Sequence, residues 1–384
     1  MKGKYPGFPL TILLAAFFSA AATTLARPSQ SATEIRLRDL VQGRLLLGAA
    51  VEARHLDNPA YARTVATHFN CITAGNEMKP DALQREKGKF TFDRADRMVD
   101  FAHQHNMTVV GHTLLWHSQS PRWLFEDEAG RPLPREEALT NLREHITTVL
   151  RHFKGRVIGW DVVNEALSDA PEEYLRDTPA RRAIGDDYVI QAFRIAREAD
   201  PEVELYYNDY NIEADYKRAK ALRLVGELRE AGVRVDALGI QGHWLLRHPD
   251  LTELERGFAE LSATGLRLMV TELDIDPLPR RRAGADVAAT EVGLDPYPDG
   301  LPSEVDAELA RRYGEVFGLM IRYANEGKLS RITLWGVDDG TSWLNYWPVR
   351  GRTNHPLLFD RQFQPKQAFF AVSRSLEQLR PSAP

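Results

Sequence analysis

Short apolar runs alternate with amphipathic stretches along this chain, and this alternation restricts its possible folds more than any other feature. Eight apolar runs are present, several of them rich in Val, Ile, Leu and aromatic residues, which is typical of strands buried on both faces. They cover residues 45–51, 69–74, 108–116, 157–164, 204–211, 235–242, 267–275 and 332–337. Stretches with helical spacing of apolar residues lie at 94–105, 136–153, 215–231, 251–263 and 305–326.

Strands that alternate with helices indicate parallel βαβ units. Eight such units, with no linker or low-complexity tract between them, predict an α/β fold in which one sheet closes into a (β/α)8 TIM barrel rather than an open doubly wound sheet. We expect a single domain over residues 35–384. The first βα loop lacks a Gly-x-Gly-x-x-Gly pattern and no Gly-x-x-x-x-Gly-Lys-Ser/Thr sequence occurs, so dinucleotide and nucleoside triphosphate binding lose their usual support.

The N-terminal residues have the pattern of an export signal. Lys2 and Lys4 precede an apolar run over residues 8–22, and the small residue Ala26 follows shortly after it. The alternative is a membrane anchor, but about 15 residues fall short of the roughly 20 that a spanning helix needs. We predict that residues 1–26 are a signal peptide and that residues 27–34 are flexible. The cleaved protein is then expected to be secreted or periplasmic, with no membrane partner.

Charge and cysteine content exclude several classes of protein. The formal net charge is −5, so we expect no nucleic-acid partner held by bulk electrostatics. Cys71 is the single cysteine, which rules out a disulfide within the chain and a cysteine-based zinc site. His112, His117 and His243 could suggest a metal triad, but no His-Glu-x-x-His sequence occurs, and we expect neither a metal nor a cofactor.

Polar side chains gather where the predicted strands end, which is where a (β/α)8 barrel builds its active site. They are Asn76 and Lys79 after the second strand, His112, Trp116 and Gln119 at the third, Asn164 and Glu165 at the fourth, Asn208 and Tyr210 at the fifth, Gln241 and His243 at the sixth, Glu272 and Asp274 at the seventh, and Trp335 and Trp343 at the eighth. Burying so many polar groups costs free energy unless each has a partner. We therefore interpret this rim as a functional site.

Tryptophan is concentrated in the same places. Five of the seven tryptophans lie at or near strand ends: Trp116, Trp160, Trp244, Trp335 and Trp343. Large flat rings beside amides, imidazoles and carboxylates suit a ligand with apolar ring faces and hydroxyl edges, such as a sugar. For Trp160, packing in the core is an equally good interpretation.

Hydrolysis of a glycosidic bond generally uses two carboxyl groups that flank the bond. Glu165 and Glu272 form the best pair, because the fourth and seventh strands lie on opposite sides of a barrel mouth. Asn164 is placed to hydrogen-bond a sugar hydroxyl. His243 is placed to hold Glu272 ionised, and Asp274, two residues beyond Glu272 on the same strand face, is placed to orient that imidazole.

Together these residues resemble glycoside hydrolase family 10, the retaining endo-1,4-β-xylanases. The matching motifs keep the order of the family over residues 35 to 380. They are Gly-Asn-Glu-Met-Lys at 75–79, His-Thr-Leu-Leu-Trp-His-Ser-Gln at 112–119, Trp-Asp-Val-Val-Asn-Glu at 160–165, Gln-Gly-His at 241–243, Thr-Glu-Leu-Asp at 271–274 and Trp-Gly-Val at 335–337. The resemblance implies that residues 35–384 are a glycoside hydrolase catalytic domain that cuts internal β-1,4-xylosidic linkages, and we expect it to act as a monomer.

The resemblance also implies roles for single residues. Glu165 would be the general acid/base and Glu272 the nucleophile that forms a covalent glycosyl-enzyme. Asn164 would bind the sugar 2-hydroxyl, and His243 and Gln241 would hold the nucleophile and the sugar. The glycone subsites would be lined by Asn76, Lys79, His112 and Trp116 and capped by Trp335 and Trp343, while Gln119, Asn208 and Tyr210 would lie around the cleft and its aglycone side.

The chain departs from the family pattern in two places. Gly75 stands where the family motif usually has Glu, a residue that hydrogen-bonds the second glycone sugar. Its loss removes about 1–3 kcal/mol of polar contact, and the gap is expected to weaken that subsite or to admit a side-chain decoration. Residues 278–302 are long for a barrel loop, and they form either a flap over the aglycone side or a solvated surface loop.

Two alternatives to a xylanase stay open from the sequence. The same chemistry could act on a mixed-linkage or cellulose glucan, or on short aryl or xylo-oligosaccharides. A barrel that binds carbohydrate without cleaving it is the second, although such a protein would usually have lost one of the two carboxylates, and Glu165 and Glu272 are both present.

Overall fold

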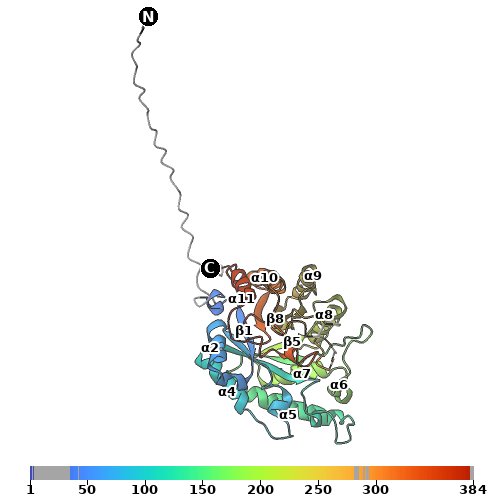
Figure 1. Cartoon of the computed structure of the whole chain (residues 1–384). Coiled ribbons are helices and arrows are strands. Elements are labelled where there is room, and N and C mark those ends of the chain that lie inside the picture. Colours follow the sequence, from blue (N-terminus) through green and yellow to red (C-terminus); the bar gives the residue numbers. More distant parts are fainter. Residues whose placement is uncertain are drawn as a thin grey trace. The chain divides into compact units, whose positions relative to one another are not determined.

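A closed ring of parallel strands forms the centre of the structure, a computed structural model, with helices arranged around it (Figure 1). The residues described are 1, 3, 35–41, 43–280, 285–288, 290, 293 and 295–380. Apart from residues 1 and 3, the predicted signal peptide (1–26) and flexible segment (27–34) lie outside them, as do parts of the 278–302 loop. One compact unit comprises Arg36–Pro384.

Eight strands close the ring, in the order β1-β2-β3-β4-β5-β6-β8-β9 and back to β1, and every pair is parallel. They are β1 (Leu46–Val51), β2 (Cys71–Ala74), β3 (Thr108–Trp116), β4 (Gly159–Asn164), β5 (Glu204–Asp209), β6 (Ala237–Ile240), β8 (Arg267–Asp276) and β9 (Leu329–Leu334). A short extra strand, β7 (His243–Leu245), pairs with the end of β8. The predicted (β/α)8 barrel is confirmed.

The longer helices pack outside the ring (Figure 1). They are α2 (Pro59–His68), α4 (Asp93–Gln104), α5 (Arg135–Phe153), α7 (Tyr188–Ala199), α8 (Asp215–Glu230), α9 (Leu251–Ser262), α10 (Ser303–Asn325) and α11 (Gln367–Leu376). Shorter helical segments are α1 (Leu37–Leu40), α3 (Pro80–Leu83), α6 (Pro179–Ile184), η1 (Ala53–Asp57), η2 (Arg122–Leu124) and η3 (Trp343–Asn345). In the described part of the chain, no helix is both long and apolar enough to span a bilayer.

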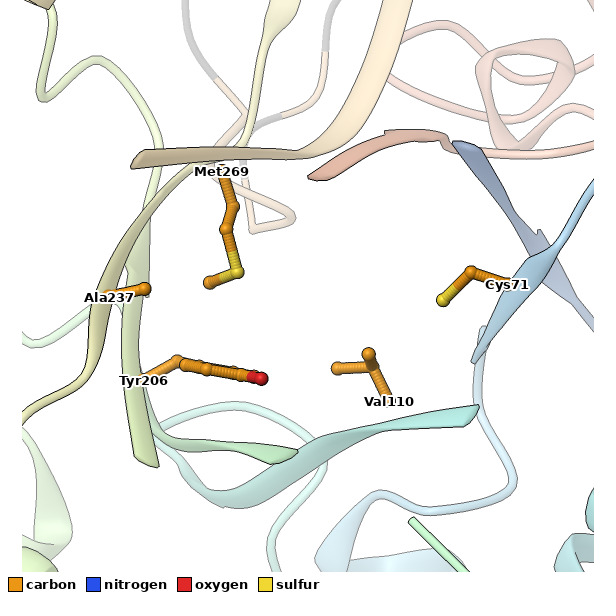
Figure 2. Packing of buried hydrophobic residues seen from close by; sticks show 5 residues of the cluster. All are labelled: Cys71, Val110, Tyr206, Ala237 and Met269. Atoms are coloured by element: carbon orange, nitrogen blue, oxygen red, sulfur yellow. The ribbon is translucent and has the colours of Figure 1, made fainter. Parts of the chain in front are cut away.

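Side chains from five different strands fill one layer of the barrel interior. Figure 2 shows Cys71, Val110, Tyr206, Ala237 and Met269 pointing toward one another, and all five are buried. Burial raises the pKa of the Cys71 thiol, which keeps it in the apolar, unreactive form. This layer is the packed floor beneath the strand ends.

The packing of one tryptophan between the barrel and the outer helices requires a glycine on the neighbouring strand. Trp160 of β4 packs against Phe153 of α5 and lies directly over Gly111 of the neighbouring strand β3. A Cβ at position 111 would lie 2.2 Å from the indole ring, so only glycine leaves room for it. Core packing is therefore the correct interpretation of Trp160.

Candidate active site

A cavity opens at the carboxyl ends of the strands and collects most of the predicted site residues. Its lining includes Asn76, Lys79, His112, Trp116, Gln119, Asn164, Glu165, Gln241, His243, Glu272, Trp335 and Trp343. These residues lie within or after strands β2, β3, β4, β6, β7, β8 and β9 and are up to 267 positions apart in the chain, from 76 to 343. They meet because parallel strands of a closed barrel all end at the same rim.

Glu165 lies in the cavity wall with a side chain held by three donors. Gln241 Nε2 donates to its Oε1 at 2.9 Å, Trp116 Nε1 donates to its Oε2 at 2.9 Å, and Asn164 Nδ2 donates to its Oε1 at 3.2 Å. The residue is only 3% exposed, and this burial raises the pKa of its carboxyl group. The donors oppose that rise without cancelling it, and the negative charge of Glu272 adds to it. Glu165 is thereby suited to hold a proton.

The backbone of Glu165 is also unusual, with φ of +59°. This left-handed conformation costs a non-glycine residue about 1–2 kcal/mol. Two contacts hold it: Glu165 N–H donates to the Asn208 carbonyl at 2.9 Å, and Arg176 Nε donates to the Glu165 carbonyl at 3.2 Å. Sequence reasoning missed Arg176, which lies in a loop and carries no motif.

Glu272 has the opposite electrostatic environment. Burial by itself would raise its pKa, but hydrogen bonding from His243 and the charges of His112 and His243 outweigh burial and lower it. His243 Nε2 lies 3.2 Å from Glu272 Oε2, and Asn208 Nδ2 donates to Glu272 Oε1 at 2.7 Å. Glu272 is therefore an ionised carboxylate at neutral pH, although it is only 5% exposed.

His243 lies between two carboxylates, as expected from the sequence. Its Nδ1 is 3.1 Å from Asp274 Oδ2, opposite the contact with Glu272. Burial acts to lower the pKa of this imidazole, but the two carboxylates, Asp274 above all, raise it to about 9. Trp343 Nε1 donates to Asp274 Oδ2 at 2.7 Å and so holds the far carboxylate in place. His243 is an imidazolium at neutral pH.

Three side-chain amides connect the two glutamates. The Oδ1 atom of Asn164 accepts from Asn208 Nδ2 at 3.0 Å and from Gln241 Nε2 at 3.2 Å. Because Asn208 also reaches Glu272 and Gln241 also reaches Glu165, the two carboxylates are parts of one hydrogen-bonded chain. We call Asn164, Asn208 and Gln241 the amide bridge.

One side of the cavity carries hydrogen-bonding side chains that follow β2 or belong to β3 and the loop after it. Lys79 Nζ donates to Asn76 Oδ1 at 3.0 Å and to Gln119 Oε1 at 2.8 Å, and it lies 4.8 Å from the centre of the Trp116 ring. Burial lowers the pKa of Lys79, although Glu272 and Glu165 both act to raise it. His112 is held from behind, with its Nδ1 2.9 Å from Asp161 Oδ2.

Three predicted rim residues lie elsewhere. Asn208 is fully buried beneath Glu272, and its amide is occupied by the amide bridge and by Thr271 Oγ1, which donates to it at 2.6 Å. The Tyr210 hydroxyl donates to Asp169 and accepts from Arg176 at 2.7 Å. Neither residue is among those that line this cavity, and their place around the cleft and its aglycone side stays a prediction. Gln119 does line it, beside Lys79.

Trp244 is the third predicted rim residue that does not line the cavity. It is buried and its indole N–H donates to Glu213 Oε1 at 2.6 Å, so it belongs to the packing behind the rim. Of the five tryptophans, Trp116, Trp335 and Trp343 line the cavity. The pattern of tryptophans at strand ends could not separate the two groups, because a residue at the end of a strand faces inward or outward according to its register.

The cavity wall also includes residues that sequence reasoning missed. Glu52, His55 and Tyr61 follow β1 and line the cavity, as Gly75 does. A Cβ at position 75 would lie 3.2 Å from Glu52 Cγ, so the Glu52 side chain occupies the space next to this glycine. The expected gap beside Gly75 is thus filled. Glu52 could have been found in the sequence as a carboxylate directly after the first apolar run, 45–51.

Part of the 278–302 loop reaches the cavity as well. Ala285 and Val287 contribute to its lining, and Trp347 Nε1 donates to the carbonyl of Asp286 at 3.2 Å. The described part of this loop is therefore more than a solvated surface segment. Among the residues that the structure describes, no cluster of three or more His, Cys, Asp or Glu side chains is arranged to hold a metal ion.

Comparison with known proteins agrees with this geometry. The family described as "Glycosyl hydrolase family 10" matches residues 36–375. Endo-1,4-beta-xylanase A of Xylanibacter ruminicola is 38% identical over 337 residues, which cover 86% of this chain and 90% of the relative. Xylanase XynB of Paenibacillus barcinonensis, solved with a conduramine derivative, superimposes with a TM-score of 0.81 at 37% identity and covers 88% of this chain and 98% of its own.

A further solved structure, a mutant in complex with xylotriose, has a TM-score of 0.80 at 34% identity. The alignment covers 88% of this chain and 99% of that one. The family match covers residues 36–375, and these two relatives cover most of the chain at 37–38% identity. The chain belongs to glycosyl hydrolase family 10.

Proposed function

We propose that this protein is an endo-1,4-β-xylanase that cleaves internal linkages of xylan with retention of configuration. The substrate class is supported by the relatives named endo-1,4-beta-xylanase A and xylanase XynB, and by the structural neighbour that holds xylotriose. The reaction is supported by one observation above all. The cavity holds two buried carboxyl groups whose pKa values are shifted in opposite directions, with Glu165 raised and Glu272 lowered.

These opposite shifts match the two roles that a retaining glycosidase needs. In the first step a Glu272 oxygen bonds to the anomeric carbon, while the bond from that carbon to the glycosidic oxygen breaks. Glu165 gives its proton to the departing oxygen. In the second step Glu165, now ionised, takes a proton from water as the water oxygen attacks the anomeric carbon, and Glu272 is released. Retention predicts a separation of about 5–5.5 Å between the carboxyl groups.

The remaining cavity residues are assigned to binding. Asn164 contacts Glu165 and is proposed to donate to the sugar 2-hydroxyl next to the cleaved bond. Lys79, Asn76 and His112 are proposed to bind the glycone hydroxyls. Trp335 and Trp343 are proposed to cap the sugar and to crowd the place where a hexose carries its hydroxymethyl group, which favours a pentose.

The test first measures which polysaccharides are cleaved and which anomer is released, and then measures variants of the two glutamates. Reducing-sugar release is measured on glucuronoxylan, arabinoxylan and carboxymethyl cellulose, with chromatography of the products and NMR of the first anomer released. Short xylo-oligosaccharides from the xylans alone, with the β-anomer formed first, support the proposal. Release from the cellulose derivative alone, or release of the α-anomer first, contradicts it.

Variants then separate the two roles. Glu272→Ala should abolish turnover on every substrate. Glu165→Ala should lose activity on xylan but keep the first step on aryl xylosides, whose leaving groups need little protonation. Glu86→Ala is the matched control, because Glu86 is exposed and pairs with Lys89 away from the cavity lining. Near wild-type activity of both catalytic variants on xylan would show that the assignment is wrong.

We also propose that the protein is exported. The support is the pattern of residues 1–26, with a basic start, an apolar centre and a small residue at the end. N-terminal sequencing of the protein recovered from culture medium and periplasm tests this. A start near residue 27 is expected, whereas an intact Met1 on protein found inside the cell contradicts it.

A further inference from the structure

Two strand ends lie side by side at one edge of the cavity. Strands β1 and β2 pair in parallel with Val51 opposite Ala74, so Glu52 and Gly75 each come directly after a paired residue. The Gly75 N–H donates to the Val51 carbonyl at 2.9 Å, which extends the pairing by one step. Glu52 and Gly75 both line the cavity. Without a side chain at position 75, the Glu52 side chain lies across the space beside it, with Cγ 3.2 Å and Cδ 4.0 Å from the place of a Cβ.

The backbone around Glu52 is anchored by a neighbouring carboxylate. Glu77 Oε1 accepts from the Ala53 N–H at 2.9 Å and from Arg94 at 3.0 Å, while Oε2 accepts from the Asn76 N–H at 3.4 Å. One buried side chain thus holds the residue after Glu52 and the residue after Gly75. Glu77 thereby fixes the positions of the two strand ends relative to each other. A binding residue needs a backbone held in place in this way.

Arg54 holds the Glu52 carboxylate but leaves some of its hydrogen-bond acceptor positions open. Its Oε2 lies 2.9 Å from Arg54 Nε. The Glu52 side chain is 22% exposed whereas that of Arg54 is 65% exposed, so the carboxylate lies in the wall and its partner lies outward. A carboxylate offers about four acceptor positions, and this ion pair occupies one of them. The others can accept from hydroxyl groups in the cavity.

The neighbours of Glu52 place it on one side of the cavity. Glu52 contacts the space beside Gly75, and Asn76 follows Gly75 directly in the chain. All three residues line the cavity together with Lys79, whose Nζ donates to Asn76 Oδ1 at 3.0 Å. Because Asn76 and Lys79 are proposed above to bind the glycone hydroxyls, Glu52 belongs to the same side of the cavity.

We propose that Glu52 accepts hydrogen bonds from hydroxyl groups of the second sugar on the glycone side, and that it determines how strongly this chain uses that sugar. The inference rests on the proposed function and names one of its specificity-determining residues. The carboxylate at this wall comes from the end of β1, and Gly75 at the end of β2 makes the room for it. A hydrogen bond from a hydroxyl to a charged group corresponds to about a 10- to 100-fold effect on binding.

A pair of substrates isolates this contact. An aryl β-xyloside places one sugar on the glycone side, and an aryl β-xylobioside with the same leaving group places two. For Glu52→Gln, kcat/KM on the xylobioside should fall about 10- to 100-fold, carried mainly by KM, while kcat/KM on the xyloside stays within about twofold. Glu86→Gln is the matched control, an exposed Glu in a salt bridge away from the cavity lining, and it should change neither value.

A second test moves the carboxylate from position 52, after β1, to position 75, after β2. Glu52→Gly should show the same selective loss as Glu52→Gln. The double variant Glu52→Gly/Gly75→Glu restores a carboxylate from the other strand end and should regain part of the preference for the xylobioside. Because Gly75 is not in a positive-φ conformation, glutamate meets no backbone strain there. This recovery would not occur if Glu52 only stabilised the fold.

The outcomes separate this inference from the proposed function. If Glu52→Gln keeps the wild-type ratio of the two kcat/KM values, or loses both equally, while the wild type still cleaves xylan, the role of Glu52 is refuted and the xylanase assignment stands. If the wild-type protein cleaves neither xylan nor either aryl glycoside, the assignment and the inference both fail.

Discussion

Replacing His243 with glutamine tests the electrostatic arrangement of the site through stability. His243 is the cation between Glu272 and Asp274, with ring nitrogens 3.2 Å and 3.1 Å from their oxygens. Glutamine keeps hydrogen-bonding groups at this position but removes the charge and its titration. The variant therefore isolates the contribution of the imidazolium.

The size and sign of the effect follow from the pKa. The pKa of His243 rises from the ordinary histidine value of 6.5 to about 9 in the folded protein. At 1.36 kcal/mol per pKa unit, this corresponds to about 3 kcal/mol of free energy of unfolding. Since the folded-state pKa is the higher one, the contribution is fully present below pH 6.5, declines as pH rises through about 9, and is absent above that.

Urea denaturation of wild type and His243→Gln at several pH values between about 6 and 10 measures this contribution. The difference in free energy of unfolding between the two proteins should be larger at pH 6 than at pH 10 by about 3 kcal/mol. Comparing the proteins at each pH removes the contribution of the titrating groups that do not interact with His243. A difference that stays constant across this range would refute the assignment of a buried imidazolium between two carboxylates.

Three further perturbations test other parts of the structure. Arg176→Gln removes a cation that lowers the pKa of Glu165, so the basic limb of the kcat/KM profile should move to higher pH, and an unchanged limb would contradict this. Gly111→Ala places a methyl group against the Trp160 ring and should lower the free energy of unfolding in urea by about 1–3 kcal/mol, whereas an equally stable variant would show that this packing is looser. Cys71 is fully buried with a raised pKa, so a thiol reagent should modify it only after denaturation, and rapid labelling of the native protein would show that its burial is wrong.

The alternation of apolar runs with helical patterns was sufficient to predict the barrel. Each predicted strand overlaps an observed one, and the third, 108–116, coincides with β3 (Thr108–Trp116). The helices α2, α7 and α11 were not predicted from the sequence. Apolar periodicity locates elements with a clear amphipathic face, but tertiary packing decides the rest.

Strand ends were likewise a good guide to the site but a poor guide to single side chains. Glu165 and His243 could be found because each follows an apolar run directly, and Glu272 because it is a carboxylate near the end of one. Tyr210 and Trp244 also stand at strand ends, yet they face Asp169 and Glu213 behind the rim. Position along the chain does not reveal which way a side chain turns once its strand has ended.

The replacement at Gly75 shows a different limit. Taken by itself, Gly75 indicated that a hydrogen bond to the sugar was missing. The sequence did not show that Glu52 lies next to it, because Glu52 is 23 positions earlier and becomes its neighbour only when β1 and β2 pair. A compensating pair of this kind is visible only in three dimensions. The arrangement of Glu52 next to a glycine could therefore not be inferred from either residue separately.

The amide bridge has a consequence for how this site can change over time. Asn164, Asn208 and Gln241 join the two glutamates mechanically, but amides carry no net charge and do not titrate near neutral pH. The bridge therefore aligns the two glutamates with uncharged groups, while the charges that act on their carboxyl groups come from residues outside it, such as His243 and Arg176. Substitutions that change those charges can shift the working pH of the enzyme while the three amides of the bridge stay in place.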